Sequence, residues 1–331
     1  MNTAVSVHDI YLARERLQGR IRRTPLVRSA WLSELTGAEV WLKLESLQVS
    51  HAFKVRGAFN AVSHLVEAPA GCQSSPRPDR VVTASAGNHG QALAWAAREA
   101  GLTAVVFTPR DAAKTKLDAI RRFGADLRAV ATNYDEAEAL AIAFAREEGA
   151  AYISPYNHPD VVAGGGTVGL EILEELPRVD VIAAPVGGGG LISGIATAVK
   201  AIAPRARVVG VEAAVNPAFR VAVAQGRVTT IPVFPTIADG LGGNVVADTI
   251  TFDIIRRLVD DLVGASEEEL TAGIRDLLGR EHLVAEGAGI AAVSAAMAGR
   301  VARPGERAAV VVSGANIDLA RLREILAPEP A

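Results

Sequence analysis

The sequence predicts an α/β fold with two lobes, in which parallel-rich twisted sheets are flanked by helices. Apolar, strand-like runs alternate with helical patterns through most of the 331 residues, which is typical of parallel sheets covered on both faces. Half of the residues are hydrophobic and 21% are charged, so a mainly disordered chain is excluded. The length is close to that of two average domains.

Short local patterns predict the individual elements. Strands are expected where apolar residues run together or alternate, and helices where apolar residues recur every three or four positions. Ser266 and Glu269 form a capping box that marks the start of one helix. In chain order, the expected strands are 40–44, 80–84, 103–107, 126–131, 179–184, 207–211 and 307–312, and the expected helices are 91–100, 112–123, 134–148 and 266–279.

The order of these elements predicts that one lobe is inserted into the other. Segment 151–157 holds Ser154 and Pro155 and follows three strand–helix units, which indicates the return crossing between two lobes. We therefore expect a larger domain made of residues 1–57 and 155–331, and a smaller inserted domain of residues 58–154.

Composition excludes several classes of protein. The formal net charge is −3, without the basic excess of a nucleic-acid binder. The longest uncharged stretch, 181–199, is broken by Pro185 and a run of glycines, so no membrane span is expected. The single cysteine, Cys72, lies in an expected exposed loop and excludes both an internal disulfide and a cysteine-based metal cluster. These features favour a cytoplasmic protein without a metal site.

Only five lysines are candidates for an amine nucleophile. Lys43, Lys114, Lys116 and Lys200 are all expected on the surface. Lys54 differs, because it follows an aromatic residue and opens a helix of small residues. A partly desolvated lysine at such a position loses its charge more readily and can form a Schiff base. Local sequence alone nevertheless favours an ordinary solvated lysine at a helix start.

Two loops between a strand and a helix are candidate anion sites. In segment 83–91, the free N–H groups of a first helical turn lie beside Ser85, Asn88 and His89, which suits a carboxylate. An ordinary helix cap made by Ser85 or Asn88 is compatible with this role. In segment 187–190, four adjacent glycines let backbone N–H groups surround a phosphate. A flexible turn is a weaker explanation of that run.

A third glycine-rich segment, 164–169, matches the spacing of a dinucleotide-binding loop. We expect this match to be spurious, because the preceding strand is too short. No acidic residue follows at the end of a second strand about 20 residues on, where the motif requires one.

Two polar residues near the end of the chain complete the candidate site. Ser313 ends an apolar strand that is expected to enter a helix, so its hydroxyl suits either a ligand crevice or a helix cap. Glu286 stands among small residues, so it is either a buried carboxylate with a raised pKa or a solvated loop residue.

Taken together, these motifs resemble a known enzyme family. The order and spacing of Phe53-Lys54, the Ser-Ala-Gly-Asn-His-Gly segment from Ser85, the Gly-Gly-Gly-Gly-Leu segment from Gly187 and the Ser-Gly-Ala-Asn segment from Ser313 are similar to those of the pyridoxal-phosphate-dependent threonine/serine dehydratases of fold type II. The resemblance covers nearly the whole chain. It implies pyridoxal 5'-phosphate as cofactor, a homodimer or homotetramer, and no C-terminal regulatory domain.

The resemblance also implies a role for each matching residue. Lys54 would form the Schiff base and move the α-proton, and Ser85 would be the second catalytic residue. Phe53 would border the pyridine ring, Asn88 would contact the ring hydroxyl, and Ser313 would bond the pyridine nitrogen. Ser85, Asn88 and His89 would hold the substrate carboxylate. The implied cofactor-binding residues are Phe53, Lys54, Asn88, Gly187, Gly188, Gly189, Gly190, Leu191, Gly240, Glu286 and Ser313.

Three departures from the family pattern bear on specificity. Ala52, preceded by His51, stands where the family has serine before the Phe-Lys pair, which alters the wall beside the Schiff base. Ala86 replaces the serine by which serine racemases reprotonate the opposite face, which favours a dehydratase. Glu212 is followed by small and apolar residues instead of acidic ones, so the divalent site of some members is expected to be lost.

The expected function is removal of water from a β-hydroxy amino acid, giving a 2-oxo acid and ammonia. L-Threonine and L-serine are the default substrates, while L-threo-3-hydroxyaspartate, bulkier 3-hydroxy amino acids and racemisation of serine stay open. A nicotinamide-dependent dehydrogenase would rest on the segment 164–169 alone. A non-catalytic relative would have no need to keep Lys54.

Overall fold

The computed structural model describes residues 5–67 and 78–327, so the loop expected around Cys72 lies outside the described residues. No helix in these two ranges is long and apolar enough to cross a membrane. The helices are α1 (Val7–Leu17), α2 (Ala30–Thr36), α3 (Lys54–Glu67), α4 (Asn88–Glu99), α5 (Lys114–Arg122), α6 (Tyr134–Glu148), α7 (Pro159–Glu175), α8 (Gly190–Ile202), α9 (Ala218–Gln225), α10 (Ile250–Leu258), α11 (Glu267–Glu281), α12 (Gly287–Met297) and α13 (Leu319–Leu326), with 3-10 turns η1 (Glu45–Leu47) and η2 (Asp239–Leu241).

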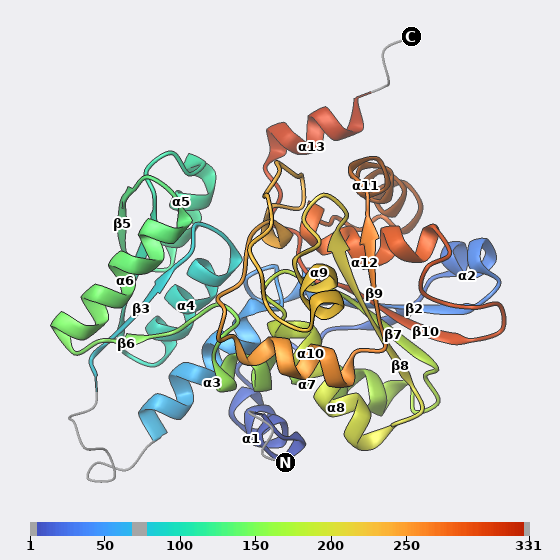
Figure 1. Cartoon of the computed structure of the whole chain (residues 1–331), viewed down its shortest axis with the longest axis horizontal. Helices are drawn as coiled ribbons and strands as arrows, with labels where there is room; N and C mark the ends of the chain where they lie inside the picture. Colours follow the sequence, from blue (N-terminus) through green and yellow to red (C-terminus); the bar gives the residue numbers. More distant parts are fainter. Residues whose placement is uncertain (1–4, 68–77, 328–331) are drawn as a thin grey trace.

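The strands form two separate sheets, which lie side by side in Figure 1. The strands are β1 (Leu26–Arg28), β2 (Glu39–Leu44), β3 (Arg80–Ala84), β4 (Thr103–Pro109), β5 (Asp126–Ala131), β6 (Ala151–Tyr152), β7 (Val181–Pro185), β8 (Arg207–Ala213), β9 (Asp261–Ala265) and β10 (Arg307–Val312).

Both ends of the described chain contribute to the larger sheet. Its order is β1-β2-β10-β7-β8-β9, and all neighbours are parallel except β1 and β2. The late strand β10 pairs with β2 on one side and with β7 on the other. The smaller sheet, β5-β4-β3-β6, is fully parallel and is built from residues 80–152, between β2 and β7 in the chain.

Helices cover both faces of the larger sheet. α2, α11 and α12 pack with one face, and α7, α8 and α10 pack with the other, in cores made almost entirely of Ala, Val, Leu and Ile. The smaller sheet has its own clusters, which include Phe107 and Phe144. The predicted α/β class with parallel-rich sheets flanked by helices is therefore confirmed.

The predicted elements are present, with boundaries that agree within three residues. The capping box at Ser266 is formed, and its helix continues to Glu281, slightly beyond the expected end. The short edge strand β1 and the partly exposed β9 were not expected, because neither shows a long apolar run.

The glycine-rich segment 164–169 lies inside α7 and is not a loop, which confirms that its dinucleotide-binding spacing is spurious. Its glycines permit close helix packing. A Cβ on Gly166 would stand 2.6 Å from the Ile10 side chain and 2.9 Å from the Gly194 carbonyl. The helix therefore uses these glycines to approach α1 and α8.

Candidate active site

A cavity of about 580 Å³ is lined by loops from both sheets. These loops follow the carboxyl ends of parallel strands, where open α/β sheets bind their ligands. The structure brings every candidate site residue to this cavity: Phe53, Lys54, Ser85, Asn88, His89, Gly187, Gly188, Gly189, Gly190, Leu191, Gly240, Glu286 and Ser313.

Lys54 is the first residue of α3, and its side chain is partly exposed at the cavity wall. Its Nζ donates to the Pro155 carbonyl at 2.9 Å and lies 5.1 Å from the centre of the Phe53 ring. Burial lowers the pKa of the Lys54 amine to about 8, although the negative charge of Glu286 opposes this shift. The residue is therefore not an ordinary solvated lysine, and its neutral form is accessible near neutral pH.

A buried ionic network lies below the first turn of α3 and was missed by the sequence reasoning. Arg56 is fully buried and makes forked contacts of 2.7 to 2.9 Å with both Glu45 and Glu171. It also donates to Thr167 at 3.0 Å. Because Glu45 follows β2 and Glu171 belongs to α7, Arg56 ties the start of α3 to both elements.

Lys43 belongs to the same network, so its expected place on the surface is wrong. Its side chain is fully buried, contacts Glu171 at 2.7 Å and donates to the Thr24 carbonyl at 2.7 Å. α7, which carries Glu171 and Glu175, lies over the Lys43 side chain, because both carboxylates contact its Nζ. A lysine and a glutamate two residues apart, at the end of an otherwise apolar strand, were the available signal.

The loop that follows β3 presents backbone donors to the cavity. α4 begins at Asn88 after Gly87, which makes no side-chain cap, so neither Ser85 nor Asn88 acts as an ordinary cap. Ser85 Oγ accepts the Gly87 N–H at 3.2 Å. The first N–H groups of α4 have no partner within the helix and are suited to a carboxylate.

The His89 ring is neutral and cannot donate a hydrogen bond to a carboxylate in the cavity. Burial, together with the charge of Lys54, lowers the pKa of the imidazole to about 3. Its Nε2 lies 3.1 Å from the Ile153 carbonyl, so Nε2 carries the hydrogen. Nδ1 then has only a lone pair, and it has no partner among the described residues. His89 can therefore offer a carboxylate its backbone N–H but no ring donor.

The four-glycine loop after β7 is a cradle that side chains would fill. Gly189 has a φ of +84°, which favours glycine. A Cβ on Gly187 would collide with the Gly240 carbonyl, and one on Gly188 with the Tyr156 ring. Thr251 Oγ1 donates to the Gly188 carbonyl at 2.9 Å, and the N–H groups that open α8 remain available to an anion.

A chain of hydrogen bonds fixes the amide of Asn88. Asn88 Nδ2 donates to Glu286 Oε1 at 2.5 Å, and Asn88 Oδ1 accepts from Asn316 Nδ2 at 2.7 Å. Asn316 also donates to the Ser50 carbonyl at 2.8 Å. Glu286 is buried, and burial together with the charge of Asp239 raises its pKa to about 7, so it is not a solvated loop residue. Asn316 is the last residue of the Ser-Gly-Ala-Asn segment, and its contact with Asn88 was not predicted.

Ser313 directly follows β10 on the cavity wall, but the chain does not enter a helix there as expected. A loop follows, and α13 begins only at Leu319. The loop is held by the segment before α3: the Ser313 carbonyl accepts the Phe53 N–H at 3.0 Å, and Ala315 N–H donates to the His51 carbonyl at 2.8 Å. These contacts bring Ser313 beside Lys54.

Glu212 has protein partners. Its carboxylate accepts the N–H groups of Phe219 and Arg220 at 2.7 and 3.0 Å, and burial raises its pKa to about 7. Among the described residues, no group of three or more His, Cys, Asp and Glu side chains could hold a metal ion.

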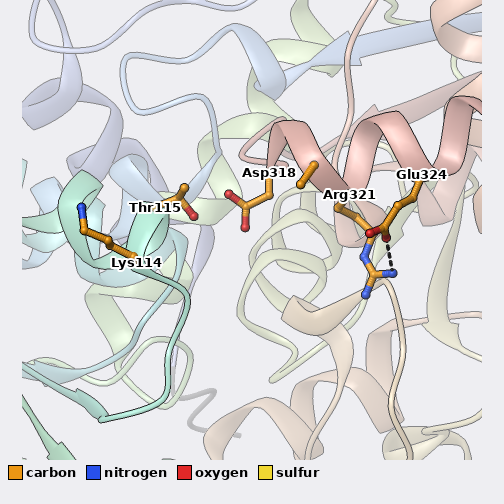
Figure 2. A pocket seen from close by; sticks show the side chains of 6 residues that line it. Lys114, Thr115, Asp318, Arg321 and Glu324 are labelled. Atoms are coloured by element: carbon orange, nitrogen blue, oxygen red, sulfur yellow. Dashed lines mark hydrogen bonds and ion pairs between the residues drawn. The ribbon is translucent and has the colours of Figure 1, made fainter.

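A second hollow, of about 470 Å³, lies between α5 and α13 (Figure 2). Three of its charged side chains have partners: Lys114 contacts Asp118 at 2.7 Å, and Arg321 contacts Glu324 at 3.1 Å. This hollow is more open to solvent than the cavity at Lys54. We assign it no ligand.

Comparison with known proteins decides the family. Residues 17–314 match the family described as pyridoxal-phosphate dependent enzyme. The chain belongs to this family. The cofactor of this pyridoxal-phosphate-dependent enzyme is pyridoxal 5'-phosphate.

Similar proteins include enzymes named for ammonia-lyase or deaminase activity and an enzyme named for racemase activity. The chain is 39% identical to the L-threonine ammonia-lyase of Thermotoga maritima over 97% of this chain and 78% of that protein. Its fold matches maize serine racemase (TM-score 0.88, 30% identity, 97% of this chain and 96% of that one). It also matches the processed form of threonine deaminase isoform 2 from Solanum lycopersicum (TM-score 0.86, 30% identity, 96% and 86%).

The residues at the cavity fit the cofactor. An aldehyde needs an amine that loses its proton easily, and Lys54 provides one. A phosphate needs backbone N–H groups, and the loop at 187–190, whose glycines carry no side chains of their own, offers the N–H groups that open α8. A pyridine ring needs a flat wall and a polar partner, and Phe53 and Ser313 line the same cavity.

Proposed function

We propose that this enzyme is a dehydratase that eliminates water from L-threonine or L-serine, in line with its similarity to an L-threonine ammonia-lyase. The organic product is a 2-oxo acid, and the amino group leaves as ammonia. One observation carries the proposal: Lys54, whose amine has a lowered pKa, shares a cavity with a backbone cradle for phosphate and a helix start suited to a carboxylate.

The proposed cofactor site uses each candidate residue once. Lys54 holds the cofactor covalently, and residues 187–190 with Leu191 hold the phosphate. Phe53 borders the ring, Asn88 contacts the ring hydroxyl and Ser313 contacts the ring nitrogen. Gly240 and Glu286 complete the wall. When bound, pyridoxal phosphate supplies the electron sink that makes loss of the substrate's α-proton feasible.

The chain's own residues then bind and move protons. The N–H groups at the start of α4, with Ser85 Oγ, hold the substrate carboxylate and so fix the Cα–H bond relative to Lys54. Lys54 Nζ takes the proton from Cα, for which its lowered pKa is suited. Lys54 then passes this proton to the β-hydroxyl, and the Cβ–O bond breaks as the hydroxyl leaves as water. A serine at position 313 does not protonate the ring nitrogen, which favours elimination over competing transamination.

Serine racemisation is a second candidate, because the fold matches maize serine racemase. Ala86 lines the cavity, and its methyl side chain has no proton to give to a substrate. This absence favours dehydration. Incubation with L-serine and chiral chromatography would detect D-serine if racemisation were the main activity.

Two coarser features are also proposed. Residues 1–57 and 155–331 would form a larger domain and residues 58–154 a smaller one, as the two sheets suggest. We propose a cytoplasmic homodimer or homotetramer. The single cysteine is ordinary for a cytoplasmic enzyme, and light scattering would compare the mass with the 34.5 kDa monomer.

The test of the main proposal joins a spectrum with an activity. We expect the purified protein to bind pyridoxal phosphate with a visible absorbance and to release 2-oxobutanoate from L-threonine. Lys54→Ala should lose both, while Lys200→Ala, which changes a lysine paired with Asp260 outside the cavity, should keep both. No 2-oxo acid from either L-threonine or L-serine would refute the dehydratase.

A further inference from the structure

An ion pair joins the two sheet units at the cavity. Lys116 lies on α5, between two strands of the smaller sheet, and Asp239 opens η2, between two strands of the larger sheet. Their side chains form an ion pair, and both residues line the cavity. The Lys116 side chain is 31% exposed, so it is not the free surface lysine that the sequence suggested.

Carboxylates outnumber available cations at this cavity. Among the described residues that line it, the basic side chains are Lys54 and Lys116, and the His89 imidazole stays neutral because burial lowers its pKa to about 3. Three acidic side chains also line it, namely Asp135 on α6, Asp239 and Glu286. Lys54 is committed to the cofactor and Lys116 to Asp239.

This balance has a consequence for the substrate side chain. The α-carboxylate of any amino acid can use the backbone donors at the start of α4. A second carboxylate, on Cβ, would need a cation of its own, and the remaining acidic side chains that line the cavity, Asp135 and Glu286, supply none. Unpaired like charges in a partly enclosed site are strongly unfavourable. A methyl group or hydrogen at the same position meets no such penalty.

Resting on the proposed function, we propose that the Lys116–Asp239 pair makes the enzyme selective for β-hydroxy amino acids with uncharged side chains. Asp239 is the specificity-determining residue, because it occupies the one ammonium, among the described residues at the cavity, that could otherwise receive a second carboxylate. L-threo-3-hydroxyaspartate is therefore excluded as a main substrate.

The first experiment compares kcat/KM for L-threonine and L-threo-3-hydroxyaspartate in the holoenzyme. We expect the wild type to prefer L-threonine by about 100-fold, a difference of the size that an unpaired charge produces. Asp239→Asn frees Lys116 and should narrow the preference by about tenfold. The double variant Asp239→Asn/Lys116→Met removes the freed ammonium and should restore the full preference for L-threonine. Asp253→Asn changes an exposed aspartate that pairs with Arg256 outside the cavity and should leave it unchanged.

A second readout does not depend on dehydration. Calorimetric titration with L-aspartate and L-2-aminobutyrate, which lack a β-hydroxyl, measures the same selectivity as binding. We expect the wild type to bind L-2-aminobutyrate more tightly, and Asp239→Asn to gain affinity for L-aspartate only while Lys116 is present. Equal binding of the two ligands by the wild type would overturn the inference.

The outcomes separate the two proposals. If L-threonine is dehydrated and 3-hydroxyaspartate is processed within about tenfold of it, the inference fails and the dehydratase stands. If neither is dehydrated, the dehydratase fails, and calorimetry alone decides the inference. A gain for Asp239→Asn that survives Lys116→Met would also overturn it, because Lys116 would then not be the receiving group.

Discussion

Replacing Arg56 by methionine should destabilise the enzyme severely, because it leaves buried carboxylates without their cation. In the native network, two buried cations, Lys43 and Arg56, balance two carboxylates, Glu45 and Glu171. Burial lowers the pKa of the Arg56 guanidinium, but the charges of Glu45 and Glu171 outweigh burial and raise it. Arg56 is therefore charged at any pH of interest.

The size of the effect follows from the contacts that are lost. Arg56→Met removes five charge-assisted hydrogen bonds and leaves one buried negative charge in excess. Removing one partner of a buried ion pair costs about 3–5 kcal/mol, against a usual total stability of about 5–15 kcal/mol. We therefore expect the free energy of unfolding to fall by about 3–5 kcal/mol.

Urea denaturation followed by circular dichroism at pH 7, with equal saturating cofactor, measures this loss. Arg14→Met, which breaks an exposed pair with Glu174, is the matched control and should cost less than about 1 kcal/mol. Arg56→Met/Glu45→Gln removes the excess charge and should recover part of the loss. A loss below about 1 kcal/mol for Arg56→Met would refute the reasoning.

The remaining predictions concern the cavity. Gly188→Ala places a Cβ against the Tyr156 ring and should weaken pyridoxal phosphate binding at least about tenfold in a spectroscopic titration. Asn316→Ala removes the donor that orients Asn88 and should lower kcat/KM for L-threonine by about tenfold, with unfolding little changed. Because the pKa of His89 stays near 3, no limb of the pH–rate profile between about pH 5 and 8 should disappear in His89→Gln.

Acid should remove the contribution of the buried network. Burial raises the pKa of Glu171, but Arg56 and Lys43 outweigh burial and lower it. A carboxylate with a lowered folded pKa contributes fully above its unfolded value of 4.5 and loses that contribution as the pH falls through the folded value. The difference in stability between wild type and Arg56→Met should therefore shrink below about pH 4.5.

The motifs that mark the residues of the candidate site are local signals in the sequence. A strand end followed by a helix start can be read from a few residues, and the carboxyl ends of parallel strands meet at one edge of a sheet. Lys54, Ser313 and the glycines at 187–190 were joined into one site by the resemblance of their motifs to a family, and all of them line one cavity. Local sequence alone favoured a solvated Lys54.

Features that depend on distant partners could not be predicted. Lys43 was expected on the surface because its partner Glu171 lies on α7, far away in the sequence, so the local sign of burial was only Glu45 two residues on. Glu286 and Asn88 are 198 residues apart, so the contact that settles the burial of Glu286 left no local trace. The segment after Ser313 was expected to be helical, but it is a loop held by hydrogen bonds to the segment before α3. These bonds join residues more than 250 positions apart, so they left no local signal in the sequence.

The charges around Lys54 act separately on its position and on its pKa. Burial and the charge of Glu286 shift the pKa of Lys54. The ionic network at Arg56, whose positive and negative charges balance, instead fixes the backbone from which the Lys54 side chain extends. Glu286 raises this pKa, so Glu286→Gln should lower it further below about 8, while Arg56→Lys should leave it in place. Cofactor capture by the apoenzyme needs the neutral amine, so the pH dependence of the capture rate reports the pKa directly. A midpoint that moves to higher pH in Glu286→Gln, or that moves as far in Arg56→Lys, would contradict this division of roles.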